Sequence, residues 1–153
     1  FEFDMKTKER NEKVMENKMK LEFIKESCNE RFARMTAVAF AAVLEPTVAE
    51  IAEIKTAVSE AVTNAIIHGY ENSEGIVTME GEIHDNEVVF VISDKGCGIE
   101  NIEKAMEPMY TGKPDLERSG MGFSIMECFM DSIEVKSKPG EGTTVRMSKV
   151  IGK

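Results

Sequence analysis

The sequence predicts an α/β domain of the two-layer α+β sandwich type, in which helices cover one face of a mixed, mostly antiparallel sheet. Two observations predict this class: helical periodicity dominates the first half of the chain, and strand patterns fill much of the second. A length of 153 residues with 42% hydrophobic content provides for one core, so we expect a single domain.

The N-terminal region begins with residues 1–14, which mix charges without a clean period. We interpret them as an extension or tag remnant and expect the domain at 15–153. Residues 19–25 alternate the apolar Leu21 and Phe23 with charged neighbours, which is the pattern of a half-buried strand.

Two consecutive helices are expected next, at 28–44 and 48–68. Each is preceded by a capping-box pattern, in which Ser or Thr is followed three residues later by Glu. The two pairs are Ser27 with Glu30 and Thr47 with Glu50. Gly69 follows the second helix, as is typical of a helix end.

A β-hairpin is predicted beyond Gly69, because extended segments at 75–84 and 87–94 flank the polar pair Asp85-Asn86. The second segment contains a continuous Val-Val-Phe-Val-Ile run, which indicates a central strand buried on both faces. The rest of the pattern predicts a short helix near 101–106, a lid loop at 107–119, a helix at 122–130 and strands at 133–138 and 143–150.

Charge and cysteine content exclude several classes of protein. Nineteen Lys and Arg against 28 Asp and Glu give a net charge of −9, which disfavours direct nucleic-acid binding. The three cysteines lack a C-x-x-C pair and fit a reducing cytosol. No apolar run reaches the length of a membrane span and no signal pattern opens the chain, so we expect a cytoplasmic protein without membrane contact.

Three polar or glycine-rich clusters are candidates for chemistry. Glu60, Asn64 and His68 recur every four residues and form one stripe on the second helix. A carboxylate and two glycines end the buried strand, as Asp94, Gly96 and Gly98, and a Ser-Gly-Met-Gly segment at 119–122 leads into a helix. Taken singly, the stripe is more typical of the solvated face of a helix, and the glycines after Asp94 are more typical of an ordinary turn. The segment at 119–122, taken alone, is also compatible with a plain helix start.

In this order, and with Gly-Thr-Thr at 142–144, the clusters resemble the ATP-binding superfamily of gyrase, heat-shock chaperones, mismatch-repair ATPases and histidine kinases. The stretches at 53–70 and 113–127 are more similar still to bacterial anti-sigma factors with serine kinase activity, and most similar to the sporulation anti-sigma-F branch. The resemblance covers residues 15–148. It implies the histidine-kinase-type ATPase fold with an ATP lid.

The resemblance also implies a function: a homodimer that inhibits a sporulation sigma factor (sigma F) and uses Mg-ATP to phosphorylate a serine of the anti-anti-sigma factor. Three alternatives stay open. These are an anti-sigma kinase of the general stress response, a non-catalytic ATP-gated sigma-binding module, and a detached histidine-kinase catalytic domain.

The chemistry of three residues can be argued beside the resemblance. Asn64 offers the neutral oxygen that Mg²⁺ accepts while it keeps waters and phosphates. Glu60, one turn earlier, is the expected general base for a serine hydroxyl. Asp94 can accept a hydrogen bond from the amine of adenine, where guanine presents an oxygen, so ATP is preferred to GTP.

Further residues are expected to bind ATP or ADP through close backbone approach, positive charge on the lid or a hydroxyl near adenine. They are Gly96, Gly98, Ile99, Thr111, Lys113, Arg118, Ser119, Gly120, Met121, Gly122, Phe123, Thr143 and Thr144. Related kinases often carry Thr-Thr-Lys in the lid, where this chain has Thr111-Gly112-Lys113, so one hydroxyl contact is lost.

The first predicted helix is apolar nearly all round. One face holds Phe32, Met35, Val38, Ala39, Ala42 and Val43, and the back face holds Ala33, Ala37, Phe40 and Ala41. Two hypotheses are open for the extra apolar face: cover by the monomer's own sheet or N-terminal residues, and an interface. Arg34 flanks the main face, and the resemblance implies that it contacts both sigma and the antagonist.

Overall fold

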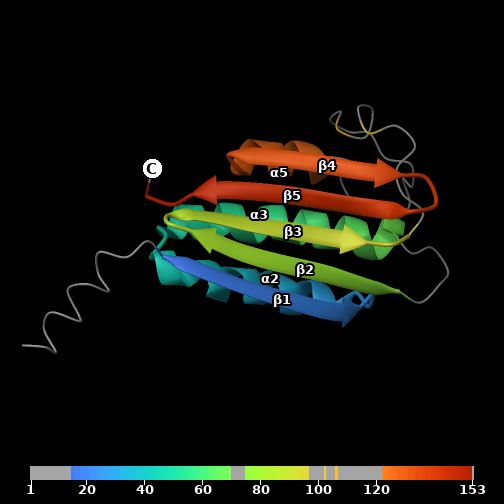
Figure 1. The fold of residues 1–153 in the computed structure, drawn as a ribbon, viewed down its shortest axis with the longest axis horizontal. Coiled ribbons are helices and arrows are strands. Elements are labelled where there is room, and N and C mark those ends of the chain that lie inside the picture. Colours follow the sequence, from blue (N-terminus) through green and yellow to red (C-terminus); the bar gives the residue numbers. More distant parts are fainter. Residues whose placement is uncertain (1–14, 70–74, 97–101, 103–105, 107–121, 153) are drawn as a thin grey trace, which may run out of the picture.

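The computed structural model describes residues 15–69, 75–96, 102, 106 and 122–152. Within them, a five-stranded sheet lies against a layer of helices, which cover one of its faces (Figure 1). The predicted two-layer sandwich is therefore confirmed. No helix in this part of the chain is long and apolar enough to cross a bilayer.

The sheet has the strand order β1-β2-β3-β5-β4. Each neighbouring pair of these strands is antiparallel, without the parallel pair that a mixed sheet would contain. The strands span Glu16–Ile24 (β1), Ile76–His84 (β2), Glu87–Asp94 (β3), Ser132–Lys138 (β4) and Gly142–Val150 (β5). The predicted hairpin joins β2 to β3, and Asp85 in its turn has a φ of 61°.

The helices follow the predicted segments with small changes of pitch. Helix α2 runs Cys28–Ala41 and tightens into the 3₁₀ turn η1 at Ala42–Leu44. Helix α3 runs Val48–Asn64 and continues as the π-helical segment η2 at Ala65–Gly69, so the regular α-helical pitch ends at Asn64. Helix α5 spans Gly122–Phe129, and Ile102 accepts a helical hydrogen bond from Met106 (3.0 Å).

The two predicted capping boxes have different outcomes. At Thr47 the box is complete: the Glu50 N–H donates to Thr47 Oγ1 (3.1 Å), and the Thr47 N–H donates to Glu50 Oε1 (2.9 Å). At Ser27 the prediction is wrong, because Ser27 makes no side-chain cap and has helical φ and ψ of −54° and −35°. The Glu30 N–H instead bonds the carbonyl of Ser27 (3.2 Å).

The core lies between the sheet and the helices. The back face of α2 is buried there through its small residues, while the ring of Phe40 stands edge-on to Phe90 with centroids 6.2 Å apart. Gly81 of β2 makes room for this contact, since a Cβ there would lie 2.9 Å from the Phe40 ring. Hence the monomer's own sheet covers the back face of α2, as one of the two hypotheses held.

The other face of α2 is open in the described part of the chain. Phe32 is 53% exposed, Met35 52% and Val43 48%. Phe32 and Met35 of α2 and Val43 of η1, here called the α2 apolar face, are thus only about half covered by the described strands and helices.

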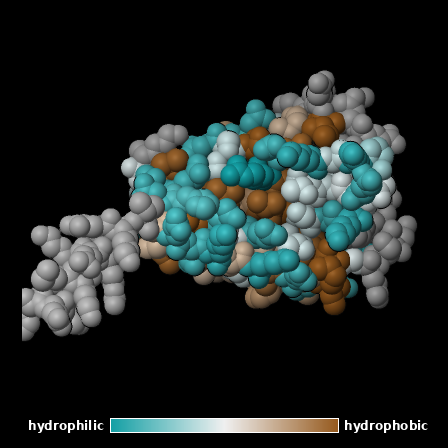
Figure 2. All heavy atoms as spheres, viewed as in Figure 1, coloured by the Kyte–Doolittle hydropathy of each residue, from teal (hydrophilic) through white to brown (hydrophobic). Residues whose placement is uncertain are grey.

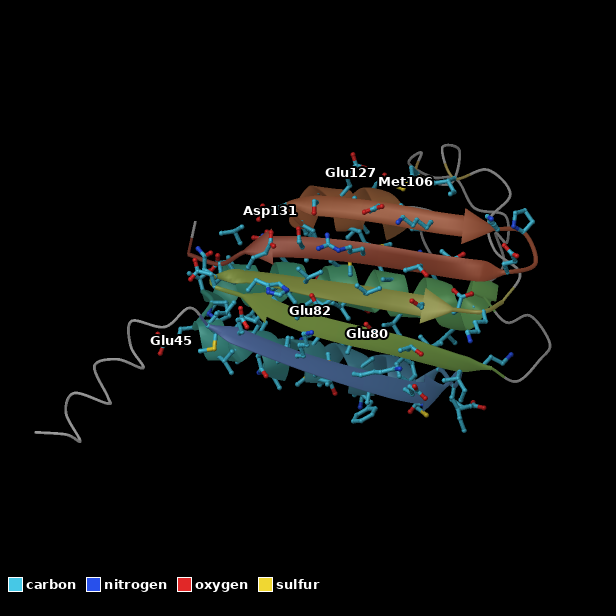
Figure 3. The ribbon with its side chains drawn as sticks, viewed as in Figure 1. Glu45, Glu80, Glu82, Met106, Glu127 and Asp131 are labelled. Atoms are coloured by element: carbon cyan, nitrogen blue, oxygen red, sulfur yellow. The ribbon has the colours of Figure 1, made fainter. Side chains whose placement is uncertain are left out.

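Strand β3 is central, as predicted, but it is not buried evenly on both faces. Its helix-facing residues are buried, whereas Val91 and Ser93 on the opposite face are half-buried. Hydrophilic side chains occupy most of that open face (Figure 2), and Glu80 and Glu82 of β2 project from it (Figure 3). Lys20 and Lys18 lie opposite these two glutamates in the register, so the face carries matched charges.

A buried amine joins three elements at the far end of the core. Lys149 of β5 is 8% exposed. Its Nζ donates to Glu53 Oε2 of α3 (3.0 Å) and to the carbonyl of Phe129 at the end of α5 (2.9 Å). This lysine therefore fixes the C-terminal end of α5 to both α3 and the sheet.

Candidate functional site

The first part of the site is a buried carboxylate where β3 ends. Asp94 continues the alternation of Phe90 and Ile92, so it faces the helices, and it is 8% exposed. Its Oδ1 accepts the N–H of Gly96 at 3.0 Å. Thr143 of β5 lies directly opposite Asp94 in the register and also donates its backbone N–H to this carboxylate.

Burial raises the pKa of the Asp94 carboxyl above its ordinary value, because the charged form loses water. The backbone N–H groups of Gly96 and Thr143 favour the charged form and offset part of this shift. Asp94 is thus a desolvated acceptor with a raised pKa at the end of the central strand, and groups of this kind are candidates for binding sites.

The strand register distinguishes the two threonines that the sequence left open. Thr143 shares the helix-facing side with Asp94, and its Oγ1 lies 2.8 Å from Ser137 Oγ. Thr144 faces the other side of the sheet, where its hydroxyl donates to Ser93 Oγ (3.3 Å). The structure brings Thr143, but not Thr144, to the carboxylate of Asp94.

Sequence reasoning missed Ser137, which supports this end of the site from β4. Its hydroxyl donates to the carbonyl of Gly142 (3.0 Å) and also lies within hydrogen-bond distance of the Thr143 hydroxyl (2.8 Å). The sequence showed only that Ser137 lies in a predicted strand. Its place beside the site depends on the pairing of β4 with β5, which puts Ser137 opposite Thr143.

The second part of the site lies where α3 meets the first turn of α5. A Cβ built on Gly122 would lie 3.0 Å from Nδ2 and 3.5 Å from Oδ1 of Asn64, and 3.3 Å from Oε2 of Glu60. The predicted metal ligand and the predicted base therefore both point at the same glycine. A side chain at this position would crowd both groups. Gly122 is also the first described residue of α5, and the N-terminus of a helix suits an anion.

The two parts lie at the same end of the molecule. The arrowhead of β3 and the C-terminal end of α3 are close in Figure 1, and the segment η2 that follows Asn64 packs against β3 and β5. Asp94 at the end of β3 and the group of Glu60, Asn64 and Gly122 thus lie at the same end of the domain.

The donor set fits a magnesium ion bound together with a nucleotide. Mg²⁺ takes oxygen ligands, keeps several waters and is usually held by one or two protein groups plus phosphates, so the amide oxygen of Asn64 is a suitable single ligand. No group of three or more His, Cys, Asp or Glu side chains that could hold a metal occurs among the residues described.

Several predicted residues lie outside the described part of the chain: Gly98, Ile99, Thr111, Lys113, Arg118, Ser119, Gly120 and Met121. Phe123, the second residue of α5, is described and packs, partly buried, against the hydrophobic core. Arg34 lies on α2, where its Nε is 3.4 Å from Glu30 Oε2 and its side chain is 26% exposed.

Comparison with known proteins confirms the resemblance. The model of the histidine kinase-like ATPase domain matches residues 26–149. The anti-sigma F factor of Clostridium acetobutylicum is 60% identical over 136 residues, covering 89% of this chain and 95% of that protein. The anti-sigma F factor of Clostridium kluyveri is 57% identical over 137 residues, covering 90% and 96%.

A solved structure supports the fold. The chain of the RsbU and RsbW domains of a Mycobacterium tuberculosis protein matches with a TM-score of 0.64 at 19% identity, over 88% of this chain and 32% of that chain. At this identity the likeness concerns the fold alone. The sequence relatives decide the family: the chain belongs to the histidine kinase-like ATPase domain group and, within it, to the anti-sigma F factors.

Proposed function

We propose that this protein binds and inhibits sigma F and that, with Mg-ATP, it phosphorylates a serine of the anti-anti-sigma factor. The observation that carries the kinase half is the meeting of Glu60 and Asn64 at Gly122. The names of the relatives support the sigma half. A sigma factor acts on RNA polymerase, so the function implies a cytoplasmic location.

Glu60 would act as the general base. Its carboxylate would take the proton of the substrate serine as the serine oxygen forms a bond to the γ-phosphorus of ATP, and the bond from that phosphorus to the β-phosphate oxygen would break, releasing ADP. A base in this position is worth typically about 10²–10⁴ in rate.

Asn64 would hold the magnesium ion, which when bound supplies positive charge to the phosphates. The first turn of α5, beginning at Gly122, would donate backbone N–H groups to the same phosphates. In a chain with a net charge of −9, such local donors matter because the overall field repels ATP.

Asp94 would select the base. The amine of adenine can donate to its carboxylate, whereas the oxygen of guanine would face it acceptor to acceptor. Thr143 is better placed than Thr144 to add a hydroxyl on this side of the sheet. The nucleotides bound would therefore be ATP and ADP.

The α2 apolar face supports the proposed homodimer. Its three exposed hydrophobic residues stand on a helix beside β1, an edge strand of the sheet, and such patches commonly mark protein interfaces. A second copy would bury Phe32 and Met35 by a two-fold contact. Phe32→Glu should convert the dimer to a monomer in sedimentation equilibrium, and a dimer of unchanged strength would contradict this interface.

The kinase is tested by transfer of labelled phosphate from Mg-ATP to purified anti-anti-sigma factor. Glu60→Gln should lower the rate by about 10²-fold or more with ATP binding retained, and Asn64→Ala should abolish transfer. Glu127→Gln is the matched control, because Glu127 lies exposed on the outer side of α5 (Figure 3). GTP should be a poor donor.

The outcomes separate the candidate functions. Transfer from ATP that depends on Glu60 and Asn64 supports the kinase. Tight ATP binding and sigma F binding without transfer would leave a non-catalytic, ATP-gated sigma-binding module. If a pull-down with both purified sigma factors captured a general-stress sigma factor in preference to sigma F, the protein would be an anti-sigma kinase of the general stress response.

A further inference from the structure

A carboxylate between α2 and α3 holds the predicted partner-binding arginine. Ser59 Oγ of α3 donates to Glu30 Oε1 of α2 at 2.8 Å. The other oxygen of Glu30, Oε2, lies 3.4 Å from Arg34 Nε, one helical turn along α2. The Glu30 side chain is only 17% exposed and that of Arg34 26%, so the contact is largely shielded from water.

The contact between Glu30 and Arg34 is an ion pair rather than a hydrogen bond. Neither Glu30 Oε2 nor Arg34 Nε makes a hydrogen bond within the described residues, although both atoms are buried. The pairing engages only the Nε end of the guanidinium. The two terminal nitrogens carry the other four N–H donors, which are those that a carboxylate on a partner would meet in a two-pronged contact.

A long arginine side chain loses rotamer freedom when a partner fixes it, and a side chain that is already oriented loses less. Glu30 can supply this orientation only if its own carboxylate is held. Ser59 holds it from a different helix, so the position of Arg34 depends on how α2 and α3 pack. We infer that Ser59 and Glu30 are positioning residues that preorganise Arg34 for binding its partners.

The anchor comes from the helix that carries the predicted catalytic groups. Ser59 immediately precedes Glu60, and adjacent residues of a helix point about 100° apart. One turn of α3 thus presents Glu60 toward Gly122 and Ser59 toward α2. The inference rests on the proposed function, because it takes Arg34 as the residue that binds sigma F and the anti-anti-sigma factor.

The test compares partner affinity in single variants by calorimetry with purified sigma F and purified anti-anti-sigma factor. Ser59→Ala should weaken both complexes about 3- to 10-fold, the usual effect of one hydrogen bond to a charged or shielded group. Ser59→Thr keeps the hydroxyl and should restore most of the affinity. Ser132→Ala, which removes a half-buried serine pair on β4 and β5, is the matched control and should change neither complex.

The decisive readout is a double-mutant cycle with Arg34→Ala. If Ser59 acts through Arg34, Ser59→Ala should have no further effect on partner affinity in the Arg34→Ala background. ATP affinity should stay as in the wild type for Ser59→Ala, whereas the unfolding midpoint should fall slightly because one hydrogen bond between α2 and α3 is lost. A purely structural role would weaken partner binding equally in both backgrounds.

Failure of this inference differs from failure of the proposed function. If Arg34→Ala weakens both complexes while Ser59→Ala binds as tightly as the wild type, the positioning role is wrong and the partner role of Arg34 stands. If Arg34→Ala binds both partners normally, the proposed partner surface is wrong, and the inference is overturned with it.

Discussion

The backbone of Asp94 passes so close to Gly142 that a Cβ at position 142 would overlap the carbonyl oxygen of Asp94. Gly142 also has a φ of 103°, a conformation that side chains with a Cβ rarely adopt. The end of β3 and the start of β5 can therefore lie side by side only because residue 142 is glycine. The position of the buried carboxylate depends on this approach.

Gly142→Ala should lose ATP binding. The new methyl group must push the Asp94 backbone away, and the backbone strain alone costs about 1–3 kcal/mol. ATP affinity by calorimetry and stability by urea unfolding check this. Gly140→Ala is the control, since Gly140 has a φ of 80° but no heavy atom within 4 Å of a built Cβ. It should lose stability and keep its affinity for ATP; equal affinities in both variants would contradict the role of Gly142.

Asp94→Asn should change how stability depends on pH. The folded pKa of Asp94 is raised above its ordinary value of about 3.8, so the unfolded chain releases this proton first as pH rises. The stability contribution is complete below 3.8 and is lost as pH rises through the folded pKa. Asn cannot titrate, so the variant should not lose stability in this way. The free energy of unfolding of Asp94→Asn minus that of the wild type should therefore increase as pH rises through this window. Urea unfolding at a series of pH values, without nucleotide, measures this difference. Parallel curves would exclude the shift.

Gly122→Ala should weaken Mg-ATP binding without unfolding the protein. The added Cβ would lie 3.0 Å from the Asn64 amide and 3.3 Å from Glu60, so these two side chains must shift by a few tenths of an ångström from their places in the site. Alanine has the higher helix propensity, by up to about 1 kcal/mol, and this offsets part of the crowding. Titrations with and without magnesium check the site: the loss should be larger with magnesium present, and an equal loss would count against Asn64 as its ligand.

Thr47→Ala should lower stability by about 1 kcal/mol, since it removes the cap of α3. Glu50, the other half of the box, also accepts the Gly152 N–H (3.0 Å), and these hydrogen bonds lower its pKa. Ser27→Ala is the matched comparison, because Ser27 caps nothing, and its thermal midpoint should stay close to that of the wild type. If Ser27→Ala lowered the thermal midpoint as much as Thr47→Ala, Ser27 would have to cap α2, in contradiction to the structure.

The elements that could be predicted from the sequence are those whose signals are local. The capped start of α3, the hairpin at Asp85 and the central position of β3 follow from neighbouring residues and are confirmed. The pattern at Ser27 has the same Ser/Thr-x-x-Glu form as that at Thr47, but it does not form a capping box, and the reason is tertiary. Glu30 is engaged by Ser59 and Arg34, so it cannot reach back to the Ser27 backbone.

The candidate site divides in the same way. The spacing of Glu60 and Asn64 predicts that they share a face of α3, and both do approach Gly122. Which of Thr143 and Thr144 accompanies Asp94 depends on the register between β3 and β5, which no single segment encodes. The support from Ser137 depends likewise on the pairing of β4 with β5.

The bond from Lys149 to the carbonyl of Phe129 anchors the C-terminal end of α5, and the fully buried Met126 anchors its middle. The eight residues of α5 are about 12 Å long, so these two anchors lie within about two helical turns of Gly122. The place of Gly122 beside Glu60 and Asn64 is therefore set from the far end of the same helix, by a lysine that lies outside the candidate site.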